Sequence, residues 1–215
     1  MVKEGFQFAL PLMGAGLLVL IPAELPSHHN TWLAIVGGVL IFISLFILYF
    51  FRDPDRVIPT NPGAVVSPAD GHVIEVVDEA CDGALWKRVS IFLSVFDVHV
   101  NRSPVAGEIS HIEYRPGRFY AAMRSRASEK NEQNIITVTT PGGDIVFKQI
   151  AGAIARRVIC WKRVGDQVAL GERIGMIRFG SRVDIWLPES SEILVRRGQR
   201  VHGGASILAI WKPTA

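Results

Sequence analysis

Cysteine is scarce in this chain: its 215 residues include only Cys81 and Cys160, which lie in separate segments. No Cys-x-x-Cys pair and no Cys/His spacing occurs, so the sequence indicates neither a zinc site nor a disulfide framework. We therefore interpret both cysteines as reduced, buried thiols of a domain in the cytosol. We expect no metal ion.

Charge of one sign is not in large excess either, because the formal net charge is only +3. A dedicated nucleic-acid-binding domain usually carries a pronounced basic patch or stripe. A mild positive charge suits an anionic membrane surface better. We therefore expect no nucleic-acid partner.

Charged residues are almost absent from the first fifty positions. Residues 6–23 are apolar except for Gln7, and residues 32–51 contain no charge at all. A helix needs about 20 apolar residues to span a bilayer, so the second run is long enough and the first is marginal. With the polar turn at residues 24–31, the two runs predict a hydrophobic helical hairpin that anchors the chain in a membrane.

The basic residues around this hairpin predict its orientation. Lys3 stands at one end and Arg52 and Arg56 stand at the other, whereas the connecting loop has no Lys or Arg. The positive-inside rule then puts both outer ends in the cytoplasm. We expect a cell-membrane protein whose following domain lies on the cytoplasmic side. Two alternatives are helices that lie in the membrane interface and a cleaved signal peptide, which Pro11 disfavours.

The segment after the hairpin marks a domain boundary. Three prolines and alternating charges in residues 51–62 stop the helix and predict an extended linker. We expect an anchoring hairpin at residues 1–51, a linker at residues 52–62 and a folded domain at residues 63–215.

Short β-branched and aromatic segments separated by Gly, Pro or Asp predict strands in this domain. The predicted strands are residues 65–66, 73–77, 89–96, 109–114, 135–140 and 144–150. Pro141-Gly142-Gly143 predicts a hairpin turn between the last two. Residues 151–162 predict a short helix that passes into a strand. The expected fold class is mainly β (α+β), a barrel-sandwich-like β domain with few helices after the hydrophobic hairpin.

An internal similarity supports a barrel-sandwich fold. Residues 165–174 and 198–207 share the pattern Gly-x-x-Val-x-x-Gly-x-x-Ile, and each predicts a strand, a tight turn and a strand. Such elements occur in biotinyl and lipoyl carriers. One hypothesis is therefore a membrane-anchored carrier or adaptor module without catalysis. Carriers display a lysine in a Met-Lys-Met-like setting, and no such motif is present.

Four patches place polar residues within apolar strand patterns. They are residues 67–72 with Asp70, residues 96–104 with His99, residues 114–120 with the polar stretch 127–134, and Gly180-Ser181. Each patch has a structural alternative. Asp70 can belong to a hairpin corner, His99 can be a hydrogen-bonded core or surface histidine, and the third patch can be solvated loops.

Gly180-Ser181 lies between two strand-like runs, and Val183, Ile185 and Leu187 alternate after it. Glycine permits backbone angles that other residues resist, so the serine Oγ can be exposed next to a flexible carbonyl. Most Gly-Ser pairs are nevertheless turns or bulges. No glycine follows two positions after the serine, so a Ser-His-Asp hydrolase with a Gly-x-Ser-x-Gly elbow is a weaker hypothesis.

Taken together, these patches resemble one family. The motifs occur in the order Ser67-Pro-Ala-Asp-Gly, Asp97-Val-His-Val-Asn-Arg-Ser-Pro, the Asn131-Glu132 loop, Gln149-Ile-Ala-Gly-Ala-Ile-Ala-Arg-Arg and Phe179-Gly-Ser. The chain is similar to the short form of phosphatidylserine decarboxylase from about Arg52 to its C-terminus, and its hydrophobic leader is similar too. Any one motif is a weak signal, but five in order are specific.

The resemblance implies that the protein makes its own cofactor. Ser181 would attack the carbonyl of Gly180 and convert the peptide bond into an ester. β-Elimination would release residues 1–180 and leave dehydroalanine, and loss of ammonia would leave a covalent pyruvoyl group at the start of residues 181–215. The two chains are expected to remain associated.

The resemblance also implies that Asp70 and a strand histidine assist this self-cleavage. His99 is the only candidate in the matching motif. Longer members of the family carry two histidines three residues apart, whereas here His99 fills the first position and Arg102 the second. Either one histidine serves both cleavage and turnover, or Asp70 acts on Ser181 more directly. A serine hydroxyl needs such a base to become a good nucleophile.

In turnover, the resemblance implies a Schiff base between the pyruvoyl carbonyl and the amine of phosphatidylserine. The conjugated carbonyl accepts electrons as carbon dioxide leaves, which yields phosphatidylethanolamine. His99 is a candidate proton donor or carboxylate partner. Candidate contacts to lipid phosphate or anionic head groups are Arg115, Arg118, Arg156 and Arg157, each also compatible with a solvated surface charge. The expected partners are phosphatidylserine and anionic membrane lipids, and a homodimer is compatible with the sequence.

Overall fold

The computed structural model describes residues 2–23, 30–81, 83–123, 126–153, 157–178 and 180–211. The chain forms two compact units, Met1–Pro54 and Asp55–Ala215. The predicted turn between the apolar runs lies almost entirely outside the described residues. The same holds for residues 154–156 of the predicted short helix, and the strand predicted after it is present.

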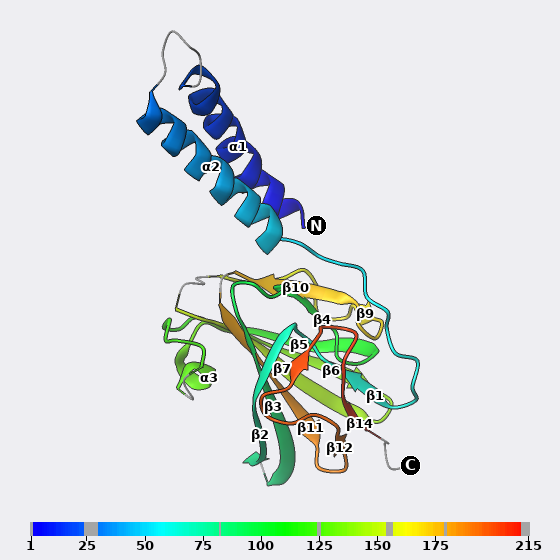
Figure 1. Ribbon diagram of the computed structural model, residues 1–215. Coiled ribbons are helices and arrows are strands. Elements are labelled where there is room, and N and C mark those ends of the chain that lie inside the picture. Colours follow the sequence, from blue (N-terminus) through cyan, green and yellow to red (C-terminus); the bar gives the residue numbers. More distant parts are fainter. Residues whose placement is uncertain are drawn as a thin grey trace. The chain divides into compact units, whose positions relative to one another are not determined.

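The first unit is a pair of helices, α1 (Lys3–Ala23) and α2 (Thr31–Phe50) (Figure 1). Small residues let them approach closely. A Cβ added to Gly16 would lie 3.1 Å from the carbonyl oxygen of Gly37, and one added to Gly37 would lie 2.9 Å from that of Gly16. The Ser44 hydroxyl donates to the Ala9 carbonyl oxygen at 2.7 Å. Small residues and a buried polar contact are typical of helix pairs in bilayers.

Both helices are long and apolar enough to cross a membrane. Large apolar side chains remain on their surfaces, and Leu18 and Trp32 are each 78% exposed. An apolar surface of this kind is unusual for a protein region that contacts only water. The predicted hydrophobic hairpin is confirmed, and it is compatible with membrane association.

The second unit is mainly β, as predicted, and its described residues include one short helix, α3 (Ala127–Lys130). Its strands are β1 (Ala64–Val66), β2 (Gly71–Cys81), β3 (Ala84–Leu93), β4 (Val100–Arg102), β5 (Gly107–Arg115), β6 (Gln133–Thr140), β7 (Gly143–Ala151), β8 (Val158–Cys160), β9 (Gln167–Val168), β10 (Arg173–Ile177), β11 (Ser181–Pro188), β12 (Glu192–Ile193), β13 (Arg200–Val201) and β14 (Ile207–Ile210). They form an eight-stranded sheet, β13-β2-β3-β11-β7-β6-β5-β9, and two three-stranded sheets, β1-β14-β12 and β4-β10-β8.

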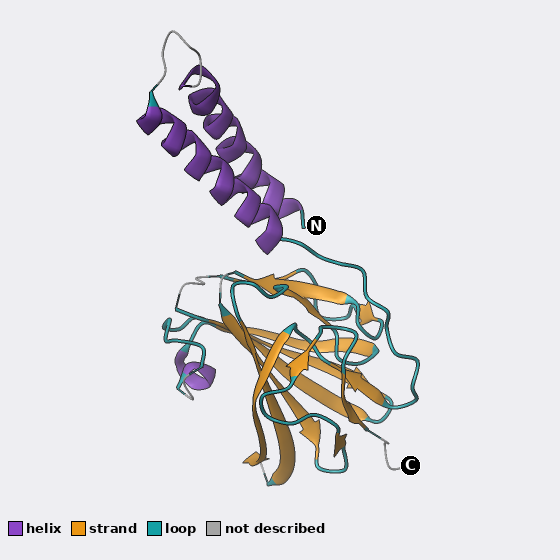
Figure 2. Ribbon diagram, in the orientation of Figure 1, coloured by secondary structure: helices purple, strands orange, loops and turns teal. Residues whose placement is uncertain are grey.

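The eight-stranded sheet curls around a single core (Figure 2). Alternate positions of its central strands point inward, and Ile91, Ile136, Phe147 and Ile185 are completely buried there. Each such side chain contributes about 1.5–3 kcal/mol to folding. The short sheets close the open side of the curl, so strands distant in sequence share one hydrophobic core.

The β unit is an internal duplication. We define the outer repeat as β1–β3 with β11–β14, and the inner repeat as β4–β10. When β13, β2, β3 and β11 are matched to β9, β5, β6 and β7, the order of the eight-stranded sheet reads the same from both ends. The two small sheets match each other strand for strand in the same way.

Backbone hydrogen bonds repeat with this correspondence. The Gly165 N–H donates to the Ile109 carbonyl at 2.8 Å, and the matching Gly198 N–H donates to the Val73 carbonyl at 2.7 Å. Each sequence repeat is a strand, a turn and a strand, as predicted. Its two strands do not form a hairpin with each other, however, because β9 pairs with β5 and β13 pairs with β2.

A second repeated motif, Ser-Pro-x-x-Gly, begins at Ser67 and at Ser103. In the first copy the serine hydroxyl donates to the Ala69 carbonyl at 2.6 Å. In the second it donates to the Val105 carbonyl at 2.7 Å. Both halves therefore use the same polar turn at the entrance to their long strands.

The Gly180-Ser181 bond lies where the chain returns from the inner to the outer repeat. In the inner repeat, β6 and β7 are joined directly, and Thr140 pairs with Gly143 across the turn. In the outer repeat the matching strands β3 and β11 pair Leu93 with Ser181, and the whole inner repeat is inserted between them. Ser181 is thus the counterpart of Gly143.

Residues 55–62 form neither helix nor strand, and part of this segment packs against one turn of each repeat. A Cβ on Gly171 would lie 2.5 Å from the Ile58 Cδ1, and one on the matching Gly204 would lie 3.2 Å from the same atom. Both glycines have positive φ, +70° and +76°. Ile58 therefore lies between the equivalent turns of the two repeats.

Candidate active site

Ser181 is the first residue of β11, and its backbone pairs with Leu93 of β3 and Ala151 of β7. Its side chain is completely buried. Within the described part of the chain, the Ser181 Oγ has no hydrogen-bond partner. An unsatisfied buried hydroxyl costs about 1–3 kcal/mol, so its retention in a well-packed sheet calls for a chemical explanation.

Gly180, the residue before Ser181, has a backbone φ of +62°, which lies in the left-handed region. A Cβ added to Gly152 would lie only 1.9 Å from the Gly180 carbonyl oxygen and 3.4 Å from the Ala122 Cβ. The carbonyl that precedes Ser181 is therefore packed against residue 152, where only glycine fits. Glycine at 180 allows the turn that brings it there.

His99 is completely buried beside this bond. Its Nδ1 lies 3.0 Å from the Asp97 carbonyl oxygen, and its Nε2 lies 3.3 Å from the Gly180 backbone nitrogen. A carbonyl only accepts, so Nδ1 carries the proton, and Nε2 accepts the Gly180 N–H. The structure brings His99, Gly180 and Ser181 together, and the unprotonated Nε2 of His99 contacts the backbone N–H of Gly180.

Asp97 holds the loop that carries His99, and sequence reasoning assigned it no role. Its Oδ2 accepts from the backbone N–H and the hydroxyl of Ser94, each at 2.8 Å. Its Oδ1 accepts from Arg200 of β13 at 2.9 Å. Arg200 stands where the inner repeat has Gln167, a difference visible when the two sequence repeats are aligned.

Asp70 lies in a separate cluster. Arg56 donates to both of its carboxylate oxygens, at 2.8 and 2.9 Å, and the Gly203 N–H donates at 2.8 Å. The His202 Nδ1 lies 3.3 Å from Oδ2. Among the described residues these are the hydrogen-bond and ion-pair contacts of its carboxylate, and Ser181 is not one of them. Arg56 and His202 were absent from the predicted site.

The predicted substrate-contacting arginines differ in their surroundings. Arg115 pairs with Glu113 at 2.6 Å, and both side chains are exposed. Arg118 donates to the Tyr120 hydroxyl at 3.0 Å. Arg157 is exposed, and Arg156 lies outside the described residues.

The alternative of a solvated loop at residues 127–134 does not hold for the second half of the stretch, because that half is buried. Asn131 and Glu132 are 1% and 7% exposed. Asn131 Nδ2 donates to the Ala151 carbonyl at 2.7 Å, next to Gly152. The Glu132 carboxylate accepts the Val158 N–H at 3.2 Å. These side chains bond to backbone groups at the end of β7 and the start of β8, which sequence reasoning could not identify.

Arg182 belongs to a buried ionic network on the opposite face of β11. Its guanidinium donates to Asp184 at 2.6 Å, to Ser90 at 2.8 Å and to Glu75 at 3.2 Å. Arg88 also donates to Glu75, at 2.7 Å. Burial by itself raises the pKa of Glu75, but the hydrogen bonds and charges of Arg88 and Arg182 outweigh it, so this pKa lies below its ordinary value.

The described residues contain no group of three or more His, Cys, Asp or Glu side chains that could hold a metal ion. Cys160 is a free thiol. The polar groups around residue 181 are a serine, a histidine and backbone amides. This set suits a rearrangement of the chain itself.

A family model described as phosphatidylserine decarboxylase matches residues 43–209. The chain belongs to the phosphatidylserine decarboxylase family. The predicted family is confirmed.

Relatives named phosphatidylserine decarboxylase proenzyme match this chain along nearly its whole length. The protein from Solibacter usitatus is 52% identical over 97% of this chain and 95% of its own. The protein from Symbiobacterium thermophilum is 45% identical over 96% of this chain and 93% of its own length. The protein from Carboxydothermus hydrogenoformans is 42% identical over 97% of this chain and 95% of its own length. The matches include the hydrophobic leader, so the leader and the β unit occur together in this family.

Proposed function

We propose that this protein is a membrane-bound decarboxylase that converts phosphatidylserine to phosphatidylethanolamine and carbon dioxide, using a pyruvoyl group made from its own Ser181. The observation that carries the proposal is the buried, unpartnered Ser181 hydroxyl next to a glycine whose backbone contacts His99. Membership of the family supports the substrate and the reaction.

Self-cleavage begins with the Ser181 Oγ attacking the Gly180 carbonyl carbon. The C–N bond breaks, Gly180 becomes an ester of Ser181, and residue 181 gains a free amine. His99 acts as the base that removes the hydroxyl proton and returns it to the amine. The close approach of Gly152 keeps the Gly180 carbonyl in one position, which favours attack because reacting atoms must be aligned.

Elimination completes the process. Loss of the Ser181 α-proton breaks the ester C–O bond, which releases residues 1–180 with a new carboxylate. The remaining enamine takes up water and loses ammonia. Overall, one water is consumed, one ammonia leaves, and a ketone caps residue 181. The residues around 181 fit such a group, because the Ser181 side chain has no hydrogen bond to lose and Gly152 has no side chain where it approaches the Gly180 carbonyl.

The pyruvoyl ketone supplies the electron sink that decarboxylation requires. The protein binds the lipid, excludes water and supplies a proton to the α-carbon, a role that we assign to His99. Asp70 is proposed to support processing from the cluster that Arg56 and His202 form around it. Arg115, Arg118 and Arg157 stay predictions as contacts to anionic head groups, as does Arg156.

The sheet topology supports continued association of the two cleaved chains. β11 lies between β3 and β7, and β14 lies between β1 and β12. Removing residues 181–215 would therefore take a central strand out of the main sheet. Val183, Ile185 and Leu187 of that strand are completely buried, so their exposure would cost several kcal/mol.

The apolar hairpin supports a location at the cell membrane, where the lipid substrate lies. The positive-inside pattern of Lys3 and Arg52 supports the cytoplasmic side for the β unit. A homodimer stays a prediction.

Gel electrophoresis and intact-mass measurement test this function. Active protein is expected to contain two fragments, residues 1–180 and 181–215. Borohydride or phenylhydrazine is expected to label the smaller one at its first residue. An active preparation that consists of one intact chain would overturn the pyruvoyl mechanism, whereas a chain that stays intact and inactive would favour a carrier or adaptor without catalysis.

A further inference from the structure

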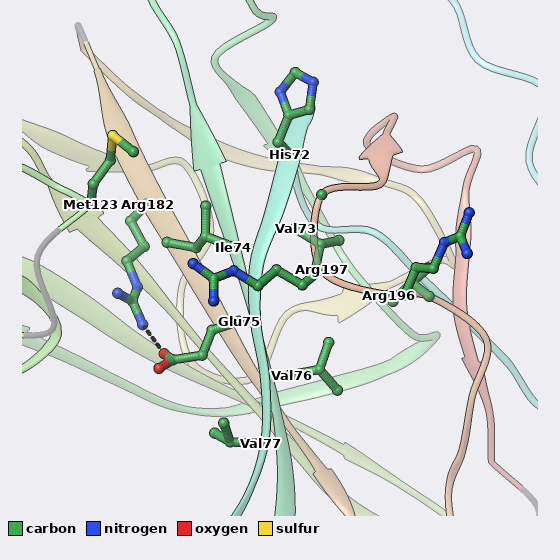
Figure 3. A pocket seen from close by; sticks show the side chains of 12 residues that line it. His72, Val73, Ile74, Glu75, Val76, Val77, Met123, Arg182, Arg196 and Arg197 are labelled. Atoms are coloured by element: carbon green, nitrogen blue, oxygen red, sulfur yellow. Dashed lines mark hydrogen bonds and ion pairs between the residues drawn. The ribbon is translucent and has the colours of Figure 1, made fainter.

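A pocket of about 780 Å³ opens on one face of β2 (Figure 3). Arg182 of β11, the strand that begins with Ser181, also lines it. Residues 72–77 of β2 line its floor, and Arg182 and Met123 line one side. The turn at residues 195–198 lines the other side with Arg196 and Arg197.

The pocket combines an apolar floor with a cationic edge. Ile74 and Val76 supply aliphatic side chains, and Figure 3 shows Arg197 extending across β2 toward Glu75. Within the described residues no hydrogen bond or ion pair engages the guanidinium of Arg197 or Arg196. The Glu75 carboxylate is already neutralised by Arg88 and Arg182. A free guanidinium is left over for an anion.

The matching turn of the inner repeat shows that these features are not required by the fold. The backbone N–H of Arg196 donates to the Gln199 side chain at 3.2 Å, and the matching backbone N–H of Arg163 donates to the Asp166 side chain at 2.8 Å. The backbone turn is thus the same, but the position of Arg197 is taken by Val164.

The floor differs between the repeats as well. β5 has Ser110 and Glu113 where β2 has Ile74 and Val77. Ile74, Val77 and the second arginine therefore belong to the outer repeat alone, whereas Val76 has an apolar counterpart in Ile112.

One lining residue of the pocket is adjacent in sequence to the Gly180-Ser181 bond. Arg182 directly follows Ser181, and Met123 follows Ala122, whose Cβ lies 3.4 Å from the Cβ position of Gly152. Gly152 in turn approaches the Gly180 carbonyl. A ligand in the pocket therefore lies beside Arg182, the residue that follows Ser181 in β11.

We propose that this pocket binds the phosphodiester and the adjoining glycerol and acyl carbons of the phospholipid substrate. Arg197 contacts the phosphate, Arg196 strengthens the field at the rim, and Ile74 and Val76 contact the apolar carbons. The inference rests on the proposed function for the identity of the lipid. It explains how a chain with a net charge of only +3 selects an anionic amphiphile.

Binding to the full-length Ser181→Ala variant tests the pocket without catalysis. The protein is held in nonionic detergent, and soluble dihexanoyl-phosphatidylserine is titrated by calorimetry. Arg197→Ala in this background is expected to weaken binding about tenfold, since it removes one charge-assisted contact. Arg163→Ala, in the matching turn of the inner repeat, is the control and is expected to change binding less than twofold.

A second pair of probes separates the apolar floor from the cationic edge. Ile74→Ser, which copies the inner repeat, is expected to weaken dihexanoyl-phosphatidylserine but to leave glycerophosphoserine unchanged, because the latter has no acyl carbons. Unchanged lipid affinity in Arg197→Ala, or an equal loss in Arg163→Ala, would overturn the proposal. Wild-type protein that neither cleaves nor decarboxylates would instead refute the proposed function, and the binding result would still decide the pocket.

Discussion

The outer and inner repeats of the β unit share a backbone plan and differ in chemistry. Asp70 of the outer repeat corresponds to Ala106 of the inner one, and His202 corresponds to Ala169. Ser181 corresponds to Gly143, and the inner repeat closes that position with a short turn. Equivalent turns, bulges and hydrogen bonds show what the fold needs, so the residues that differ are those available for function.

The reacting bond lies at the junction of the repeats rather than within one of them. Ser181 begins a strand of the outer repeat, whereas His99 directly precedes β4 of the inner repeat. The duplication therefore supplies two sheet halves, and the crossing between them brings the proposed nucleophile and the proposed base from different halves together.

Removing the nucleophile is expected to have the largest effect. Ser181→Ala leaves no hydroxyl to attack Gly180, so cleavage and decarboxylation should both be lost while the chain stays folded. Gel electrophoresis, intact mass and thermal unfolding measure these outcomes. Residual activity in this variant would refute the origin of the cofactor.

Copying the Gly-Ser pair into the inner repeat sharpens the comparison. Gly143→Ser creates the same dipeptide at the matching position. We expect no cleavage after Gly142, because that turn has no counterpart of His99. Normal release of residues 181–215 would show that the variant folds. A new fragment ending at residue 142 would mean that the dipeptide alone suffices.

Removing the base is expected to slow cleavage by about 100-fold or more, the usual contribution of a general base. His99→Ala tests this in a time course of fragment appearance after synthesis. His99→Gln is the control, because its amide oxygen can accept the Gly180 N–H but cannot take a proton at neutral pH. Cleavage at the wild-type rate in both variants would exclude His99 as the base.

Asp70→Asn breaks a nearly buried ion pair found in the outer repeat. Both Asp70 and Arg56 are largely shielded from water. We expect a loss of about 2 kcal/mol in the free energy of unfolding and slower processing. Urea titration and fragment time courses measure the two effects. Glu113→Gln, which breaks an exposed pair of the inner repeat, should leave the free energy of unfolding nearly unchanged. Normal processing in Asp70→Asn would remove Asp70 from the reaction.

The turn glycines test how closely the repeats pack. Gly171→Ala and Gly204→Ala both add a Cβ against Ile58 at positive φ, so we expect each to cost about 2 kcal/mol. Gly198→Ala also has positive φ but meets open space, so it should cost only about 1 kcal/mol. Equal losses at all three positions, in urea unfolding, would show that the linker does not pack there.

The smallest effect concerns acid stability. The pKa of Glu75 is lowered in the folded state, so its contribution to stability is present above its unfolded pKa and is lost as pH falls through the lower folded value. Its side chain is partly exposed, so Glu75→Gln should cost at most about 1 kcal/mol at pH 7. The difference from wild type should shrink toward pH 3. A difference that stays constant with pH would exclude the charge as its source.

The amino-acid sequence determined the apolar hairpin, the mainly β domain and the family, because each rests on local patterns or on ordered motifs. Long uncharged runs predict helices in any fold, and β-branched segments bounded by Gly and Pro predict strands. Ser181, Gly180, Asp70 and His99 were predicted as site residues in the same way. The sequence also revealed one repeated element, although not the duplication to which it belongs.

Only the tertiary structure decided which polar residues meet. Arg56 and His202 reach Asp70 from far along the chain, and Arg200 reaches Asp97, because strand pairing in the duplicated sheet brings their segments together. Arg182 and Asp184 alternate with core residues, a pattern that predicts exposure, but they are buried by other strands and α3. Sequence spacing records neither non-local pairing nor the burial it causes, so these contacts follow from the fold alone.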